Sequence, residues 1–125
     1  MGRFYFGQIL EVGFPDGHGK TAPHPMVIID NDEACNRGED FLCILISSSP
    51  SKDRPYYHIQ VHHQTKEHPV TRFNRPCWAK CNVVREINPS RVRRTWGHMP
   101  DDLLSRIVEM YDRLLGLGDE FDDWQ

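Results

Sequence analysis

The sequence predicts a small, mostly β domain that ends in one amphipathic α-helix. Short runs of β-branched and aromatic residues recur as far as Ile87, and segments rich in glycine and proline separate them. Helical periodicity is confined to the region after Pro100, so strands and helices do not alternate as they do in a parallel α/β sheet. This pattern is typical of a small barrel or sandwich with a helix packed against it.

The first half of the chain supplies three expected strands. Residues 4–12 are rich in aromatic and β-branched side chains and predict the first strand. Residues 13–25 are dense in glycine and proline and predict a long loop. Short continuous apolar runs at residues 26–29 and 41–46 indicate buried strands, joined by the polar connection 31–40.

The second half adds further strands before the helix. Apolar residues alternate at Tyr57, Ile59 and Val61, which is the period of a half-buried strand. Residues 77–87 predict one or two more strands, and residues 88–90 predict a turn. We expect residues 91–97 to lead from that turn into the final helix.

The helix carries the clearest pattern in the chain. Pro100 suits a first helical position, where its missing N–H costs nothing. Asp101 and Asp102 place negative charge at the positive helix end. Apolar residues then recur with the spacing of one helical face, at positions 103, 104, 107, 108, 111, 114 and 115. We therefore predict a helix from Asp101 to Leu115.

Size and composition indicate one reduced, water-soluble domain. The 125 residues suit a single domain, here residues 1–117, followed by an acidic tail at residues 118–125. The net charge of −3 excludes a strongly basic nucleic-acid binder but not a local basic groove. The N-terminus lacks the pattern of a signal peptide, so we expect a cytoplasmic protein with its four cysteines reduced.

Several short motifs follow one another in a recognisable order. They are Gly-Gln-Ile at 7–9, a glycine-rich loop containing Lys20, His-Pro-Met-Val-Ile at 24–28, an apolar strand ending in Ser47 and Ser48, Val-Arg-Glu-Ile at 84–87, Ser-Arg-Val at 90–92, Trp-Gly-His-Met-Pro at 96–100 and Leu-Leu-Gly-Leu at 114–117. Over nearly the whole chain, this ordered set resembles the PemK/MazF toxin family.

The resemblance implies an SH3-like small β-barrel with a terminal helix, usually assembled as a homodimer. It also implies sequence-selective cleavage of single-stranded RNA without a metal or another cofactor. The expected protein partner is a cognate antitoxin whose acidic segment fills the RNA groove. The acidic tail of this chain resembles such a segment in composition, and we expect it to be able to shield the basic groove.

Two positions differ from the family pattern. The family usually has Arg where this chain has His24, and Thr where it has Ser47. Metal-free RNA cleavage needs a base for the 2′-hydroxyl and a cation for the charged phosphorane. Histidine can serve either role near neutral pH, and serine keeps the hydroxyl of threonine. We therefore predict His24 and His18 as acid and base, with Ser47 orienting the phosphate.

Basic and hydroxyl side chains are the candidates for RNA binding. They are Lys20, Ser48, Arg72, Arg75, Lys80 and Arg85. Phe73 or Trp78 is a candidate for stacking against a base.

Two other readings remain open on sequence alone. The same fold without its usual Arg can act as a non-catalytic binding module for nucleic acid or protein. The residues His58, His62, His63, His68, Cys77 and Cys81 are of zinc-ligand types. However, Cys77 and Cys81 would lie about 13 Å apart on a strand, too far to bind one ion together.

Overall fold

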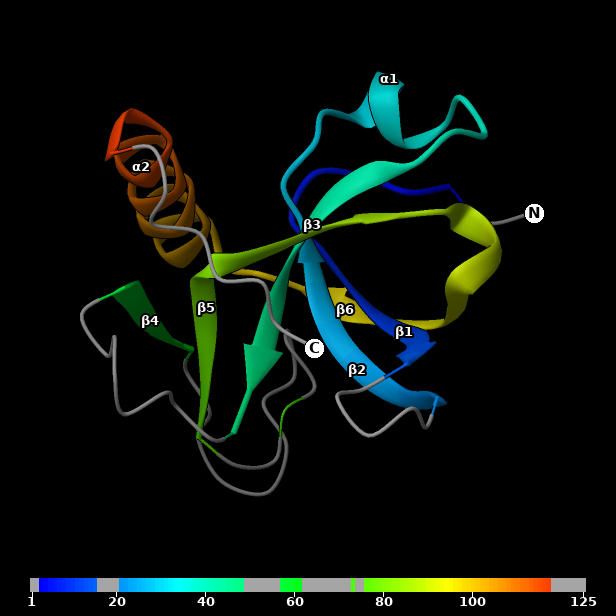
Figure 1. Ribbon diagram of the computed structural model, residues 1–125, viewed down its shortest axis with the longest axis horizontal. Coiled ribbons are helices and arrows are strands. Elements are labelled where there is room, and N and C mark those ends of the chain that lie inside the picture. The colour runs from blue at the N-terminus through cyan, green and yellow to red at the C-terminus, as the bar shows by residue number, and fades with distance from the viewer. Residues whose placement is uncertain (1–2, 16–20, 49–56, 62–72, 74–75, 118–125) are drawn as a thin grey trace.

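The computed structural model describes residues 3–15, 21–48, 57–61, 73 and 76–117 (Figure 1). The elements follow in the order β1 (Gln8–Pro15), β2 (Thr21–Ile28), α1 (Asp32–Cys35), β3 (Phe41–Ser47), β4 (His58–Val61), β5 (Cys77–Ile87), the 3₁₀ helix η2 (Pro89–Arg91), β6 (Val92–His98) and α2 (Asp101–Leu117). Within these residues, no helix is long and apolar enough to cross a membrane.

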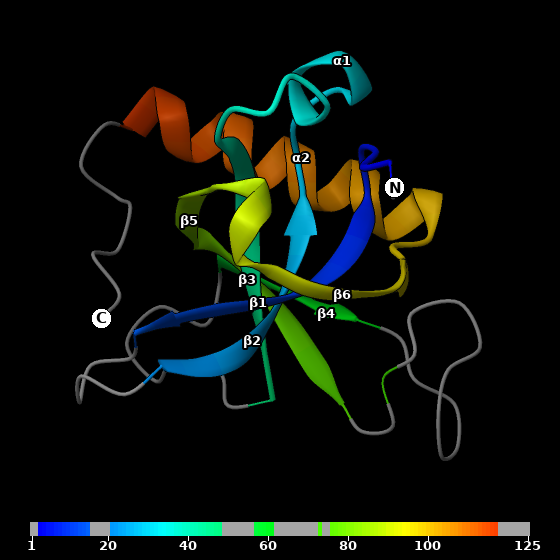
Figure 2. The same ribbon diagram turned by 90° about the vertical axis from the view of Figure 1, so that its right-hand side faces the viewer.

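All six strands belong to one antiparallel sheet with the order β4-β5-β3-β2-β1-β6. The sheet is strongly twisted, and α2 extends along one side of it (Figure 2). In the part of the chain that the structure describes, the outer strands β4 and β6 do not pair, so the sheet stays open rather than closing into a barrel. The predicted class, mostly β with a C-terminal helix, is confirmed.

The sheet buries side chains on both faces. On the face toward α2, Ile9, Val27 and Ile44 pack with Leu103 and Ile107. On the other face the buried side chains are Leu10, Val12, Met26, Ile28, Phe41, Cys43, Leu45, Val83 and Ile87, together with Cys35 of α1. Neighbouring residues of a strand point to opposite faces, so apolar side chains at successive positions feed two separate cores. This double burial explains the continuous apolar runs in the sequence.

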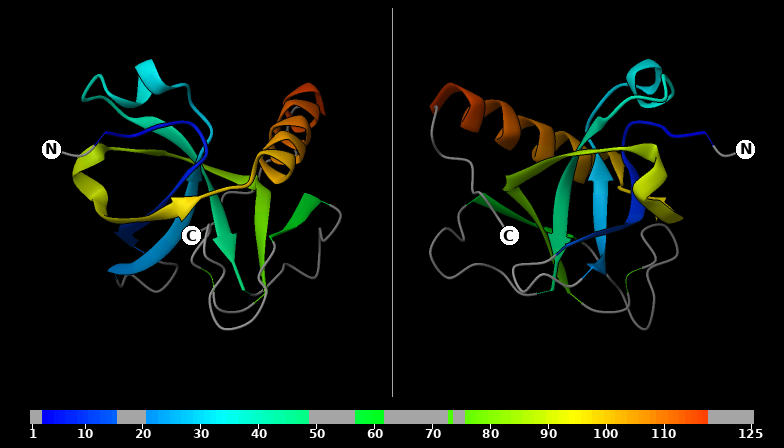
Figure 3. Two further views of the ribbon diagram at one scale, coloured as in Figure 1. Left: turned by 180° about the vertical axis from the view of Figure 1, so that it is seen from behind. Right: turned by 45° about the vertical axis from the view of Figure 1, so that its right-hand side comes forward.

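Helix α2 confirms the amphipathic prediction. It begins at Asp101 as expected and ends at Leu117, two residues later than predicted. The side chains buried from it are Leu103, Leu104, Ile107 and Leu114. It packs against β4 and β5 (Figures 1 and 3). Leu115 was expected on the buried face but is 54% exposed, so that face ends at Leu114.

The prediction of a long loop over residues 13–25 was wrong. Residues 13–15 belong to β1 and residues 21–25 belong to β2, so the two strands form one long hairpin. Proline has no backbone N–H to donate, so it is rare in a strand that pairs on both sides. Pro23 and Pro25 are tolerated because only β1 pairs with this part of β2, whose pairing with β3 begins at Met26.

Strand β6 replaces the expected lead into the final helix. It pairs with β1 from Gln8↔His98 to Val12↔Val92 and forms an edge of the sheet. Most of its side chains are exposed, so no alternation of apolar residues marks it in the sequence. Residues 77–87 form the single strand β5, with a register shift opposite Ile44 and Leu45.

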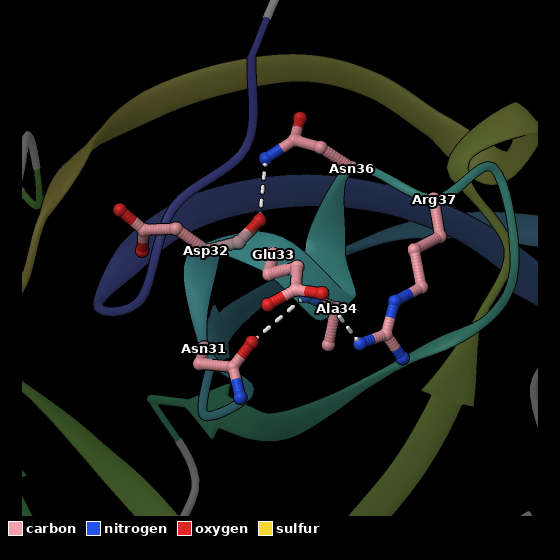
Figure 4. A network of polar contacts seen from close by, with 6 residues as sticks. All are labelled: Asn31, Asp32, Glu33, Ala34, Asn36 and Arg37. Atoms are coloured by element: carbon pink, nitrogen blue, oxygen red, sulfur yellow. Dashed lines mark hydrogen bonds and ion pairs between the residues drawn. The ribbon is translucent and has the colours of Figure 1, made fainter.

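The polar connection before β3 contains the one-turn helix α1, held by side-chain caps (Figure 4). Asn31 Oδ1 accepts a hydrogen bond from the Ala34 amide at 2.8 Å, an N-cap that satisfies a backbone donor. Asn36 Nδ2 donates to the Asp32 carbonyl at 2.7 Å and to the Phe4 carbonyl at 2.6 Å. These bonds tie the segment before β1 to α1.

Gly7, the residue before β1, offers a direct test of how this part of the chain packs against α2. Its φ of +88° lies in the left-handed region, and a Cβ added there would lie 2.7 Å from Leu104 Cδ2. Gly38 has a similar φ of +82°, but an added Cβ would meet open space. Both Gly→Ala changes incur a backbone cost of roughly 1–2 kcal/mol. We expect Gly7→Ala to lose about 1–3 kcal/mol more, because it also overpacks the core.

Urea unfolding of both variants measures this difference in the free energy of unfolding. Equal losses for Gly7→Ala and Gly38→Ala would contradict the proposed packing contact.

Candidate functional site

A pocket of about 490 Å³ opens where β2 and β3 separate. The pairing of these strands ends at Met26↔Leu45. If the register continued, His24 would face Ser47 directly across the gap. The pocket is lined by Glu11, Pro23, His24, Pro25, Leu45, Ile46, Ser47, Ser48, Phe73, Cys77, Arg94 and Trp96. It therefore joins residues from β1, β2, β3, β5 and β6.

An acidic and a basic side chain, Glu11 and Arg94, form the polar side of this pocket and come from neighbouring strands. Glu11 on β1 lies opposite Arg94 on β6. Its Oε2 accepts a hydrogen bond from Arg94 Nε and a longer one, at 3.4 Å, from Trp96 Nε1. The Glu11 side chain is 12% exposed, whereas that of Arg94 is 67% exposed. A mostly buried carboxylate thus holds a guanidinium that extends into solvent.

Two aromatic rings support that polar side. The Arg94 guanidinium carbon lies 5.7 Å from the centre of the Trp96 ring, within the range of a cation–π contact. Phe73 is buried and packs against Trp96 with ring centres 5.5 Å apart. Trp96 is therefore fixed between a core side chain and the guanidinium, and these flat groups form the rim of the pocket.

The structure brings together three of the predicted site residues. His24, Ser47 and Ser48 all line the pocket. Strand alternation groups the His24 side chain with Met26 and Ile28, and its Nε2 is shielded from solvent.

Of the other predicted site residues, Lys80 and Arg85 lie outside the pocket lining. Lys80 lies on β5 opposite His58 of β4, outside the pocket lining. Arg85 Nη1 donates to the carbonyl of its own neighbour, Val84, at 2.9 Å. His18, Lys20, Arg72 and Arg75 fall outside the described residues. Of the two stacking candidates, Phe73 lines the pocket and Trp78 does not.

Sequence reasoning missed Glu11, Arg94 and Trp96 as members of one site. Glu11 falls inside an apolar strand pattern, and the other two belong to a strand that the sequence did not reveal. A signal was nevertheless present. A single acidic residue among the apolar positions of a buried strand requires a partner in the fold.

The cysteines of the described chain are free thiols, and all four are buried. Burial raises the pKa of the Cys81 thiol to about 12. Burial, together with the carboxylates of Asp30 and Asp32, raises the pKa of Cys35 to about 11. Thiols held in the protonated form are poor nucleophiles and poor metal ligands. The described residues contain no group of three or more His, Cys, Asp or Glu side chains that could hold a metal ion, while His62, His63 and His68 fall outside them.

Comparison of the sequence with known protein families identifies one family. The family model described as PemK-like, MazF-like toxin of type II toxin–antitoxin system matches residues 5–114. The chain therefore belongs to that family. Among curated protein sequences, none matches it significantly.

Solved structures share the fold at low sequence identity. MazF from Deinococcus radiodurans (form I) superposes with a TM-score of 0.71 at 15% identity, covering 93% of this chain and 99% of that one. An endoribonuclease from a mycobacterial species, solved in complex with its cognate antitoxin, gives a TM-score of 0.69 at 11% identity and covers 93% and 96%.

His58 is a partly buried titratable group outside the pocket lining. Both of its ring nitrogens are shielded from solvent and have no hydrogen-bond partner among the described residues. Burial lowers its pKa below the ordinary value of 6.5, and the nearby Lys80 ammonium lowers it further. The folded protein therefore favours the neutral ring.

We expect the free energy of unfolding to fall as the pH drops below 6.5, because the unfolded chain then binds a proton that the folded chain resists. His58→Gln removes this proton uptake and should flatten the fall between about pH 7 and pH 5. Urea unfolding across this range measures the slope. His98→Gln, an exposed change on β6, is the control. An unchanged slope in His58→Gln would refute the assignment.

Proposed function

We propose that this protein is the toxin of a toxin–antitoxin pair and cuts single-stranded RNA in a sequence-selective, metal-independent reaction. The observation that carries the proposal is the pocket between β2 and β3. It gathers His24, Ser47 and Ser48 beside an exposed guanidinium and a half-buried indole. Family membership and the fold shared with a mycobacterial endoribonuclease and with MazF support the same activity.

The reaction we propose is attack of the substrate 2′-hydroxyl on the adjacent phosphorus. Such a pocket must accept a proton, donate a proton and stabilise a charged phosphorane. His24 is our candidate acid, and Ser47 is the candidate that orients the phosphate. Ser48 and Arg94 supply further donors at the same opening. In our proposal His18 is a further candidate for acid–base work, and the basic side chains that bind RNA are Lys20, Arg72, Arg75, Lys80 and Arg85.

The RNA substrate must be single-stranded for a base to reach this opening. Unstacked bases bind flat side-chain surfaces, and the paired Trp96 indole and Arg94 guanidinium provide one. We further propose an antitoxin and a second copy of the chain as protein partners. The antitoxin is supported by the mycobacterial neighbour, which was solved with its own antitoxin.

The test is incubation of the purified protein with a long single-stranded RNA in EDTA. We expect discrete fragments, and we expect His24→Ala to slow their formation by about 10²–10⁴-fold, the usual contribution of a proton-transfer group. Ser47→Ala should slow it about tenfold, the effect of one lost hydrogen bond. Ser105→Ala, on the exposed side of α2, serves as the control. Thermal melting of each variant separates lost chemistry from lost folding.

Intact RNA across several unrelated sequences would contradict the enzyme. It would favour the alternative, a non-catalytic binding module on the same fold. In that case a binding measurement with labelled RNA replaces the cleavage assay.

A further inference from the structure

We infer that Glu11 is the general base of this pocket and that Arg94 is the cation that stabilises the phosphorane. The inference rests on the proposed RNA cleavage and deepens it. Glu11 and Arg94 lie outside the family motifs of this sequence, so the assignment depends on the geometry alone.

The first support is the set of atoms that the ion pair leaves available. Glu11 Oε2 receives both of the hydrogen bonds to this carboxylate, from Arg94 Nε and Trp96 Nε1. Glu11 Oε1 accepts none from a described residue and is not shut off from solvent. Arg94 uses Nε for the pair, and its two terminal amino groups donate to no described residue. One free carboxylate oxygen and one free guanidinium fork therefore lie at the same pocket.

The second support is the contrast with an ordinary cross-strand ion pair. Such a pair on a sheet surface contributes roughly 0.2–1 kcal/mol and leaves both partners exposed. Here the carboxylate is 12% exposed and fixed by two donors, and only the guanidinium is exposed. Glu33 and Arg37 show the ordinary case, since their side chains are 82% and 54% exposed. When a carboxylate is already fixed in a pocket, the groups around it need to rearrange less as it accepts a proton.

The third support is the position of the carboxylate relative to the histidine. Glu11 pairs with Pro25, the residue after His24, so strand alternation places the side chains of Glu11 and His24 on opposite faces of the sheet. Both line the pocket that opens between β2 and β3. We therefore assign the tasks of base and acid to groups that approach this pocket from opposite sides.

The proposed step conserves atoms and charge. Glu11 Oε1 takes the proton of the 2′-hydroxyl as the 2′-oxygen bonds to phosphorus. The bond from phosphorus to the 5′-oxygen breaks, and that oxygen takes a proton from His24. The products are a 2′,3′-cyclic phosphate and a 5′-hydroxyl. The proton on Glu11 then returns to His24 through solvent, so that one proton has moved from the 2′-oxygen to the 5′-oxygen. The Arg94 fork matches the phosphate oxygens in two parallel hydrogen bonds.

Three variants test this assignment on the full chain with single-stranded RNA in EDTA. Glu11→Gln keeps an oxygen acceptor for Arg94 and Trp96 but cannot take a proton. We expect it to lower kcat by about 10²–10⁴-fold, the usual contribution of a general base. Its affinity for an uncleavable 2′-O-methyl RNA should be equal to that of the wild type or higher, since one negative charge is removed. Glu33→Gln, the matched change in the exposed Glu–Arg pair, should leave cleavage unchanged.

Chemical rescue separates a base from a residue that only positions its neighbours. Glu11→Ala leaves space in a pocket of about 490 Å³, so added formate should restore part of the lost kcat. Arg94→Gln should lower kcat strongly, whereas Arg94→Lys should retain part of it because it keeps the positive charge. Thermal melting confirms that each variant is folded.

The outcomes distinguish this inference from the function on which it rests. Wild-type protein that leaves every RNA intact would overturn both. Wild-type protein that cuts RNA, with Glu11→Gln retaining more than a tenth of its kcat or Glu11→Ala showing no rescue by formate, would overturn only the role of Glu11.

Discussion

The parting of β2 from β3 beyond the Met26–Leu45 pair determines where this protein can act. Pro23 and Pro25 lie in the part of β2 that only β1 pairs with, and neither can donate to a second neighbouring strand. The end of β3 carries Ser47 and Ser48 and lines the resulting gap. The pocket is therefore a consequence of backbone hydrogen bonding, because two prolines end a ladder whose other strands continue.

The rest of the sheet keeps this opening in place. One core packs against α2 and the other lies on the opposite face, so the strands that border the pocket are fixed on both sides. Strand β1 is central to this arrangement because it pairs with β2 and β6 at once. A side chain on β1 can thus have neighbours on two strands: Glu11 pairs with Pro25 of β2 and accepts hydrogen bonds from Arg94 and Trp96 of β6. Groups placed on packed strands are held more firmly than groups on loops.

The structure gives a physical context for the departure from the family pattern at position 24. Histidine at position 24 cannot supply the permanent forked charge of arginine. The same pocket nevertheless contains such a charge, because Arg94 lines it from the edge strand β6. The total negative charge of the chain does not describe this local arrangement, in which one exposed guanidinium is set over a buried carboxylate. The charge arrangement of the site therefore follows from which strands pair, and not from the net charge of the chain.

Local pattern in the sequence determined the fold class, the helix from Asp101, the buried strands and the position of His24 and Ser47 in the family motif. These features depend on periodicity and on neighbouring residues, which a single chain displays directly. The extension of β1 and β2, the existence of β6 and the meeting of Glu11 with Arg94 were decided only by the tertiary structure. Strand β6 has an exposed surface and is recognisable only through its partner β1, and Glu11 and Arg94 are separated by 83 positions in the chain. Glu11 indicates in the sequence that a partner is needed, but which residue it meets depends on strand register, which neither segment shows by itself.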